Sequence, residues 1–318
     1  MGWELICANP YAEHPLHESL RMAWIFKGWH MAKLLTKRKQ AWVDKRKPQV
    51  IRGAPLNNPS ILEEKFARRL EQLVAKMCDD VNQKLARFFT EPHAEEYFDA
   101  AQDASVSSQA RILSNALMKK FNGMFSSLAP TIAEQQLNAV NAASSSAVHS
   151  SLRDLSGGLS LPTTGITSDM QEVLSASTTE MVGLIKSISQ EYLSGVQGQL
   201  MRSITSGNGL ADLVPYLEKH KGITQRRARM IARDQSLKAY NNLNRGRMQA
   251  LGLRKYMWLH TGGSAHPRKL HQSYNGKIFS FDDPPVVDEH TGDRGIPGTA
   301  INCRCRMRVV LEFDTGEK

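Results

Sequence analysis

The sequence predicts an α+β protein, in which a long and mostly helical N-terminal two thirds is followed by a small α+β C-terminal domain. Three observations predict this. A strongly amphipathic segment begins at Ser60, a stretch rich in Ser, Ala and Gln runs from about residue 95 to 206, and short strand-like runs separated by Gly and Pro follow residue 255. The chain of 318 residues is long enough for one to three domains. We expect the segments 1–57, 58–206 and 207–318.

The composition favours a protein that is not secreted and has an anionic partner. The mean hydropathy is −0.40, no run approaches the roughly 20 apolar residues of a spanning helix, and the N-terminus lacks the pattern of a signal peptide. The net charge of +10 favours nucleic acid as a partner, because each neutralised phosphate releases a counterion. The cysteines are too few and too unevenly spaced for a disulfide framework, which favours reduced thiols or a metal site and synthesis in the cytoplasm. They are Cys7, Cys78, Cys303 and Cys305.

The first segment, 1–57, is expected to be a basic, aromatic arm. Its lysines and arginines between residues 27 and 52 are opposed only by Asp44, and Trp24, Trp29 and Trp42 lie among them. One interpretation is an arm that lies on DNA or in an acidic groove of a partner; the other is a solvated helix whose tryptophans pack on their own domain. The candidate binding residues are Lys37, Arg38, Lys39, Lys45, Arg46 and Lys47.

The second segment, 58–206, is expected to be an extended helical region. Ser60 and Glu63 have the spacing of a capping box, and apolar residues recur at helical spacing from Leu62 to Leu85. Beyond residue 95, large apolar residues become sparse and a loop is expected near 156–168. We expect long, weakly amphipathic helices that find their burial against other subunits.

The third segment, 207–318, changes in character after a linker-like run at 206–209. A basic helix is expected over 225–247, and strands over 256–259 and 307–311. Arg226, Arg229 and Arg233 recur at helical spacing. A solvated basic face is the simpler interpretation, and contact with DNA or a partner is the alternative.

An ordered set of motifs runs from about residue 225 to 308. Arg233 follows Ala232 in the helix, Trp258 lies in a strand, Arg268 and His271 lie in a turn, and an Asn-Cys-Arg-Cys run ends the set. In this order and spacing the segment resembles the C-terminal domain of phage head morphogenesis proteins related to protein F of phage Mu. The resemblance covers about the last third of the chain. The motif residues are Arg233, Asn241, Trp258, Arg268, Gly276, Asn302 and Arg304.

The chain departs from the family pattern at two places. Gln235 stands where the family has Glu, and the run from Gly298 to Ile301 lacks a His that often precedes the Asn-Cys-Arg-Cys motif. The alternative function is a phage-encoded nuclease or nucleotide-transfer toxin that uses the C-terminal His, Cys and Arg cluster. Gln235 weakens this alternative, because acid–base chemistry usually needs a carboxylate or His. A free DNA-binding regulator would need a recognition helix, and none stands out.

The resemblance implies a minor capsid (head) protein of a tailed bacteriophage. Such a protein lies in the capsid interior near the portal vertex, after assembly in the host cytoplasm, and acts in head assembly and in DNA packaging or ejection. The implied partners are the portal protein and the major capsid protein, with genomic DNA as a further candidate and no membrane at assembly. No catalytic residue is assigned, and the protein is not expected to be an enzyme.

Cys303 and Cys305 alternate on a probable strand, which puts both sulfurs on one face, and the family resemblance implies that His271 lies near them. With a fourth ligand from His266 or His290 they would form a closed, structural Cys2His2 zinc site with bonds of about 2.1–2.3 Å. The other interpretation is that both cysteines are small buried apolar residues and that His271 is hydrogen-bonded in a turn.

Arg268 and Arg304 are open to two interpretations. They could contact phosphate, or they could pair with Asp282, Asp283 or Asp288 and so hold the loops together.

Overall fold

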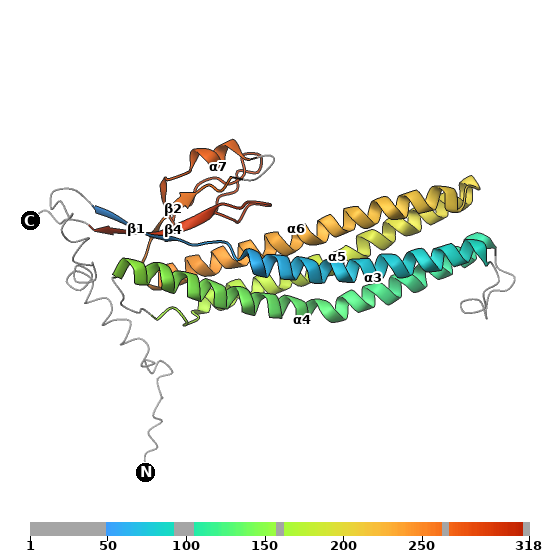
Figure 1. The fold of residues 1–318 in the computed structure, drawn as a ribbon, viewed down its shortest axis with the longest axis horizontal. Helices are drawn as coiled ribbons and strands as arrows, with labels where there is room; N and C mark the ends of the chain where they lie inside the picture. Colours follow the sequence, from blue (N-terminus) through green and yellow to red (C-terminus); the bar gives the residue numbers. More distant parts are fainter. Residues whose placement is uncertain (1–48, 92–104, 157–161, 263–266, 314–318) are drawn as a thin grey trace, which may run out of the picture.

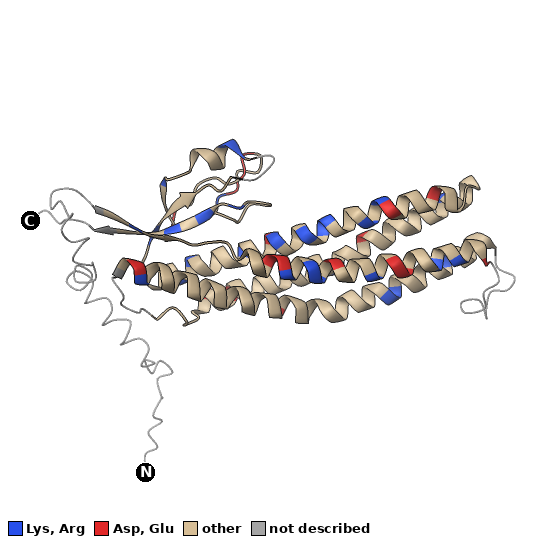
Figure 2. Ribbon diagram, viewed as in Figure 1, with Lys and Arg blue, Asp and Glu red and all other residues tan. Residues whose placement is uncertain are grey.

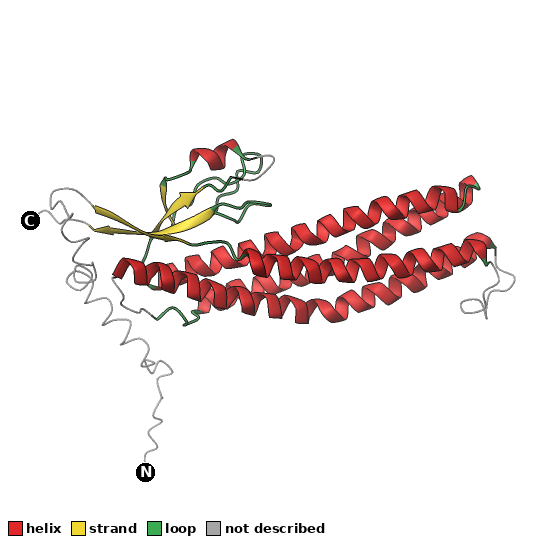
Figure 3. Ribbon diagram, viewed as in Figure 1, coloured by secondary structure: helices red, strands yellow, loops and turns green. Residues whose placement is uncertain are grey.

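The computed structural model describes residues 49–91, 105–156, 162–262 and 267–313. In these residues, four long helices lie side by side in an elongated bundle, and a small antiparallel sheet lies at one end of it (Figures 1 and 3). The expected α+β class, with a mostly helical N-terminal part and strands near the C-terminus, is confirmed.

The bundle consists of α3 (Ser60–Thr90), α4 (Val106–Ser156), α5 (Ser168–Ser206) and α6 (Leu210–Ala250). At about 1.5 Å per residue, α4 alone is roughly 75 Å long. The expected helix start at Ser60 and its apolar stripe are confirmed, since Phe66, Leu70 and Leu85 are buried. The expected capping box is not formed, because Pro59 occupies the cap position and no side chain caps the helix.

The four helices bury one another, which corrects the expectation that they depend on other subunits for burial. One continuous apolar core takes residues from all four, and α6 contacts each of the other three. Small buried residues such as Ala133, Ala228 and Ala232 contribute to it. A sequence lean in large apolar residues therefore forms a core by bringing narrow stripes from four helices together.

The run expected to be a linker is a tight turn between α5 and α6. Gly207 ends α5 with a φ of 74°, and Gly209 precedes α6 with a φ of 53°. The basic helix expected over 225–247 lies within the longer α6. Residues 210–250 are thus part of the bundle, while the proposed segment boundaries at 57 and 206 stay predictions.

The sheet has the strand order β1-β4-β2-β3, formed by β1 (Gln49–Pro55), β2 (Lys255–Leu259), β3 (Ile278–Ser280) and β4 (Arg306–Phe313). The two expected strands correspond to β2 and β4. Each pair of neighbours is antiparallel. Strand β1 comes from the end of the segment expected to be an arm, and it lies against α4, where Ser151 Oγ donates to the Ala54 carbonyl at 2.8 Å.

A second apolar core joins the sheet to the end of the bundle. It combines Trp258 and Met307 of the sheet with Leu152 of α4 and Met248 of α6. The short helix α7 (Lys269–Ser273) lies on the side of the sheet away from the bundle (Figure 1). The sheet therefore lies between α7 and the end of the bundle (Figure 1).

Charged residues of both signs lie along α3, those of α6 are mainly basic, and α4 and α5 are largely uncharged (Figure 2). Lys221 of α6 pairs with Asp79 of α3 at 2.6 Å, and Lys120 of α4 pairs with Asp80 at 2.7 Å. Pairs at the surface contribute only about 0–1 kcal/mol each, so apolar packing dominates. None of the helices in the described ranges has an apolar stretch of the length that a membrane crossing requires.

Candidate functional site

Three buried side chains of the C-terminal part meet at one point. His271 lies on α7, and Cys303 and Cys305 lie in the turn before β4. Their candidate ligand atoms are all within 4.8 Å of one another. His271 Nδ1 is 3.4 Å from Cys303 Sγ and 3.9 Å from Cys305 Sγ. The structure thus brings together the three residues that were expected to meet.

The two cysteines precede β4 rather than lying on it, because the strand begins at Arg306. A turn places them. Asn302 has a φ of 59°, a conformation that Asn adopts more readily than most residues, and the Cys303 amide donates to the Ala300 carbonyl at 3.0 Å. Both cysteines are buried all the same, while Arg304 between them is exposed.

The His271 ring is fixed from both sides. Its Nε2 is 2.9 Å from the Val287 carbonyl, and because a carbonyl only accepts, Nε2 carries a proton and donates it. Nδ1 is therefore the atom that faces the sulfurs. Trp258 packs edge-on against the ring, with 5.1 Å between the ring centroids.

The electrostatics of the cluster favour a thiolate at Cys303 and a protonated thiol at Cys305. A hydrogen bond from Cys305 is the main influence that holds the pKa of Cys303 below its usual value, and His271 adds to it against the effect of burial. The same hydrogen bond raises the pKa of Cys305, and burial raises it further. Burial lowers the pKa of His271, but the hydrogen bond with Cys303 and the charge on that sulfur outweigh it, so that the pKa is raised.

A second histidine, His260, reaches the cluster and was not expected from the sequence. Its Nδ1 is 3.6 Å from Cys305 Sγ. Strands β2 and β4 pair Leu259 with Arg306, so one step further along the same register sets His260 opposite Cys305. Of the two histidines proposed as a fourth ligand, His266 lies outside the described residues, and His290 is exposed, with its amide bonded to Asp288.

The other motif residues hold the C-terminal turn against α6 and β2. The Asn302 amide donates to Asp234 of α6 at 3.1 Å. Asn241 is fully buried and lies so close to Gly298 that a Cβ on this glycine would be 2.3 Å from Asn241 Nδ2. Gly276 has a φ of 79°, and its amide donates to the Trp258 carbonyl at 2.8 Å. The roles of these motif residues are therefore close packing and unusual backbone conformations.

Arg268 also serves the turn, because its Nη1 donates to the Ile301 carbonyl at 3.1 Å. Of the three aspartates proposed as its pairing partners, two pair with other arginines, whereas Asp288 accepts from the His290 amide at 2.9 Å and its pKa is lowered by that bond and, to a smaller extent, by the charge of Arg268. Arg294 pairs with Asp283 at 2.5 Å, and Arg254 pairs with Asp282 at 3.4 Å.

Arg233 and Arg304 meet beside Glu63 at a pocket of about 250 Å³, between the start of α3, α6 and the cysteine turn. Glu63 Oε1 is buried without a hydrogen-bond partner in the described part of the chain. Burial raises the pKa of Glu63, although both arginines oppose the shift. The pocket therefore contains charges of both signs, which does not mark it as a site for either a cation or an anion.

The three arginines of α6 do not form one free basic face. Arg229 makes a two-pronged ion pair with Glu71, with both distances 2.8 Å, and it also contacts Glu64 at 2.9 Å. Arg226 is exposed. One of the three thus links α6 to α3, and only Arg226 has the exposure expected of a solvated face. The arm residues from Lys37 to Lys47 lie outside the described residues.

Gln235, which stands where the family has Glu, is buried and donates to Glu180 of α5 at 2.8 Å. A carboxylate at this position would face the Glu180 carboxylate. The neutral Gln235 is therefore compatible with the Glu180 carboxylate on α5, which accepts its hydrogen bond.

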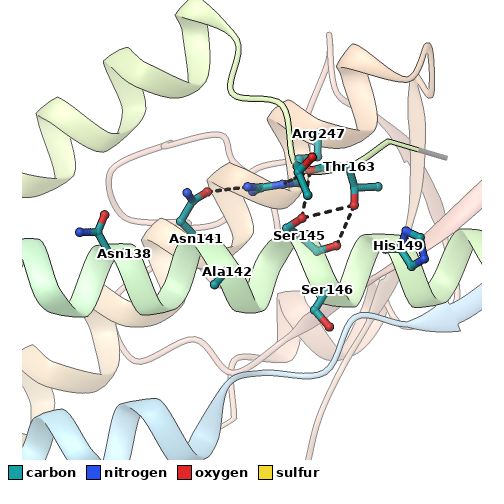
Figure 4. A pocket seen from close by; sticks show the side chains of 9 residues that line it. Asn138, Asn141, Ala142, Ser145, Ser146, His149, Thr163 and Arg247 are labelled. Atoms are coloured by element: carbon teal, nitrogen blue, oxygen red, sulfur yellow. Dashed lines mark hydrogen bonds between the residues drawn. The ribbon is translucent and has the colours of Figure 1, made fainter. Parts of the chain in front are cut away.

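A polar pocket of about 460 Å³ lies beside α4, near the sheet end of the bundle (Figure 4). Arg247 at its base is 3% exposed and has no acidic partner in the described ranges. Its guanidinium donates to the Thr163 carbonyl at 3.0 Å, to Ser144 at 2.8 Å and to Asn141 at 2.5 Å. Through these hydrogen bonds to neutral acceptors, Arg247 of α6 holds α4 and the α4–α5 connection in place.

Comparisons with known proteins identify the C-terminal part. Residues 194–308 match the family described as phage Mu protein F like protein. An uncharacterized protein of Haemophilus influenzae (strain Rd) is 29% identical over 247 residues, which cover 78% of this chain and 53% of that protein. The chain thus spans about half the length of this relative. No solved structure matches the chain.

The family match starts within α5 and ends in β4, so it includes α6, the cysteine turn and every motif residue. At the level of the family, this indicates a component of phage heads. The C-terminal region of the chain, residues 194–308, is therefore similar to the phage Mu protein F like family over its whole length.

Proposed function

We propose that the protein is a minor head protein that binds the portal and the major capsid protein inside the head of a tailed phage, and that it acts in head assembly and in DNA packaging or ejection. The observation that carries the proposal is the family match over residues 194–308. The packing roles of the motif residues support a scaffold rather than an enzyme. Asn241, Gly276 and Asn302 hold the fold together through close packing and backbone hydrogen bonds.

The shape of the molecule supports a role in joining other proteins. A bundle based on a helix of about 75 Å presents a long lateral surface, and the sheet forms a different surface at one end (Figure 1). The bundle buries its own apolar stripes. Partners would therefore be recognised through its mixed charges, through the sheet end, or through the arm.

Virion composition tests the proposal. Heads purified from the producing phage should contain the protein in far fewer copies than the major capsid protein, as measured by quantitative mass spectrometry. The protein should also co-purify with tagged portal protein when the two are expressed together, and a portal mutant that fails to assemble into rings serves as the control. Heads that lack the protein altogether, or equal recovery with and without the portal, would contradict the proposal.

A further inference from the structure

The distances within the cysteine cluster match those between ligands of one metal ion. Zinc binds sulfur at about 2.3 Å and nitrogen at about 2.0–2.1 Å in a tetrahedron, which places a sulfur and a nitrogen ligand roughly 3.6 Å apart. His271 Nδ1 lies 3.4 Å from Cys303 Sγ and 3.9 Å from Cys305 Sγ. His260 Nδ1 lies 3.6 Å from Cys305 Sγ. All three distances lie close to the expected value.

The second nitrogen of His271 is arranged as it is in metal sites. A histidine that binds a metal usually donates its other N–H to a carbonyl or a carboxylate, which fixes the ring and its tautomer. Here Nε2 donates to the Val287 carbonyl at 2.9 Å, and Nδ1 points its lone pair at the two sulfurs.

N–H donors surround the sulfurs. The indole N–H of Trp258 is buried without a hydrogen-bond partner in the described residues, and this group and the Thr261 amide lie near enough to Cys305 to lower the pKa of its thiol. The amide of Cys305 in turn reaches Cys303. N–H donors of this kind stabilise a thiolate, which is the form of cysteine that binds metal.

In a hydrogen-bonded cluster, the His271 nitrogen would bond to one thiol and the second thiol would bond to the first. A neutral His271 whose Nε2 carries the proton has one lone pair, on Nδ1, and it can accept a hydrogen from one thiol. Both sulfurs nevertheless lie within 4 Å of this atom. A metal ion at the common centre would use the nitrogen and both sulfurs at once.

We propose that His271, Cys303 and Cys305 bind one zinc ion, and that His260 supplies the fourth ligand. Two thiolates with two imidazoles in a tetrahedral arrangement favour zinc over harder or larger ions. The His260 ring, which contacts only Cys305 of the three, has to turn toward the common centre to complete the site. His260 is half-buried, and its amide is anchored on Asn275 at 3.0 Å.

The site would be structural. Its ligands come from the end of β2, from α7 and from the turn before β4, so that one ion ties together three loops around a small core. With four protein ligands there is no open position for a substrate or an activated water. The inference stands on this geometry and does not depend on the proposed function in phage heads.

Metal content of the purified full-length chain gives the first test. The protein is prepared under reducing conditions without a polyhistidine tag, and zinc is measured by elemental analysis against protein concentration. We expect one zinc per chain. Replacement by Co²⁺ should give the intense visible bands of a tetrahedral site and a thiolate-to-cobalt charge-transfer band in the near ultraviolet.

Variants then identify the ligands. Cys303→Ser and His271→Gln should lose stoichiometric zinc. His260→Gln should keep both thiolate bands but bind Co²⁺ more weakly, with shifted visible bands as water replaces an imidazole. His290→Gln is the matched control, because this histidine is exposed and should leave the spectrum unchanged.

The metal content of the unmutated chain decides the matter even if Cys303→Ser fails to fold. A chain that carries no zinc as purified, and takes up neither zinc nor Co²⁺ when both are offered under reducing conditions, overturns the site. An unchanged cobalt spectrum in His260→Gln removes His260 from the ligand set.

Discussion

Gly298 is the position at which one added methyl group should disturb the C-terminal domain most. Its φ is 83°, and a Cβ there would lie 2.3 Å from Nδ2 of Asn241. Asn241 is fully buried, and its Nδ2 donates to the Leu237 carbonyl at 3.0 Å. The methyl group must therefore push a side chain that has no free space to move into.

The expected cost of Gly298→Ala combines three effects. A residue with a Cβ in the left-handed region costs about 1–2 kcal/mol, overpacking of a core adds roughly 1–3 kcal/mol, and loss of the Asn241 hydrogen bond adds about 1 kcal/mol. We expect the free energy of unfolding to fall by roughly 3–6 kcal/mol.

Gly292→Ala is the matched control. Gly292 has a similar φ of 74°, but nothing lies within 4 Å of the position of its Cβ. Its substitution should cost only the backbone term of about 1–2 kcal/mol. Urea unfolding of the purified chain, followed by circular dichroism, measures both variants.

A double-variant cycle isolates the contact itself. In an Asn241→Ala background, the added methyl group meets no amide, so Gly298→Ala should cost no more than Gly292→Ala. Equal costs for the two glycine substitutions in the unmutated background, or an unchanged cost of Gly298→Ala after Asn241 is removed, would refute the reasoning.

Three further predictions concern charged groups. Burial raises the pKa of the Glu63 carboxyl above its ordinary value of 4.5. The folded state therefore binds the carboxyl proton more tightly than the unfolded chain does, and the protein loses stability as the pH rises through the folded-state pKa. Glu63→Gln should have a higher melting temperature than the unmutated chain at neutral pH, and the difference should vanish in acid. Arg229→Ala removes the bridge to α3 and should cost about 1 kcal/mol, whereas Arg226→Ala on the same helix should cost under about 0.5 kcal/mol in the same urea assay. Neutralising the six basic residues between Lys37 and Lys47 should weaken DNA binding in a gel-shift assay and reduce its salt dependence; unchanged binding would favour a protein partner for the arm.

Helices and strands that are marked by a local pattern of apolar residues were predictable from the sequence. The helix that begins at Ser60 follows from apolar residues at a spacing of 3.6, and β2 and β4 follow from compact runs of apolar residues. The meeting of His271 with Cys303 and Cys305 was expected from the family resemblance, and the structure brings them together.

Features that depend on distant pairing were missed. Strand β1 lies at the end of a basic stretch, and it becomes a strand only because β4 supplies its hydrogen bonds. His260 has no local signal, but antiparallel pairing of the two expected strands would have set it opposite Cys305. The sparse apolar residues of α4 and α5 could not reveal whether their partners lay in this chain or in another.

Strand β1 has a consequence for the order in which the chain folds. It is the first element that the structure describes, and it pairs with β4, the last. The four helices can close their core as soon as residue 250 has left the ribosome, but β1 must wait for residues 306–313. Until then its backbone groups are unpaired, as in an exposed sheet edge. A ribosome that stalls after residue 250 has emerged, but before residues 306–313 are made, would therefore release a chain with a formed bundle and an unpaired strand, a substrate for chaperones and proteases.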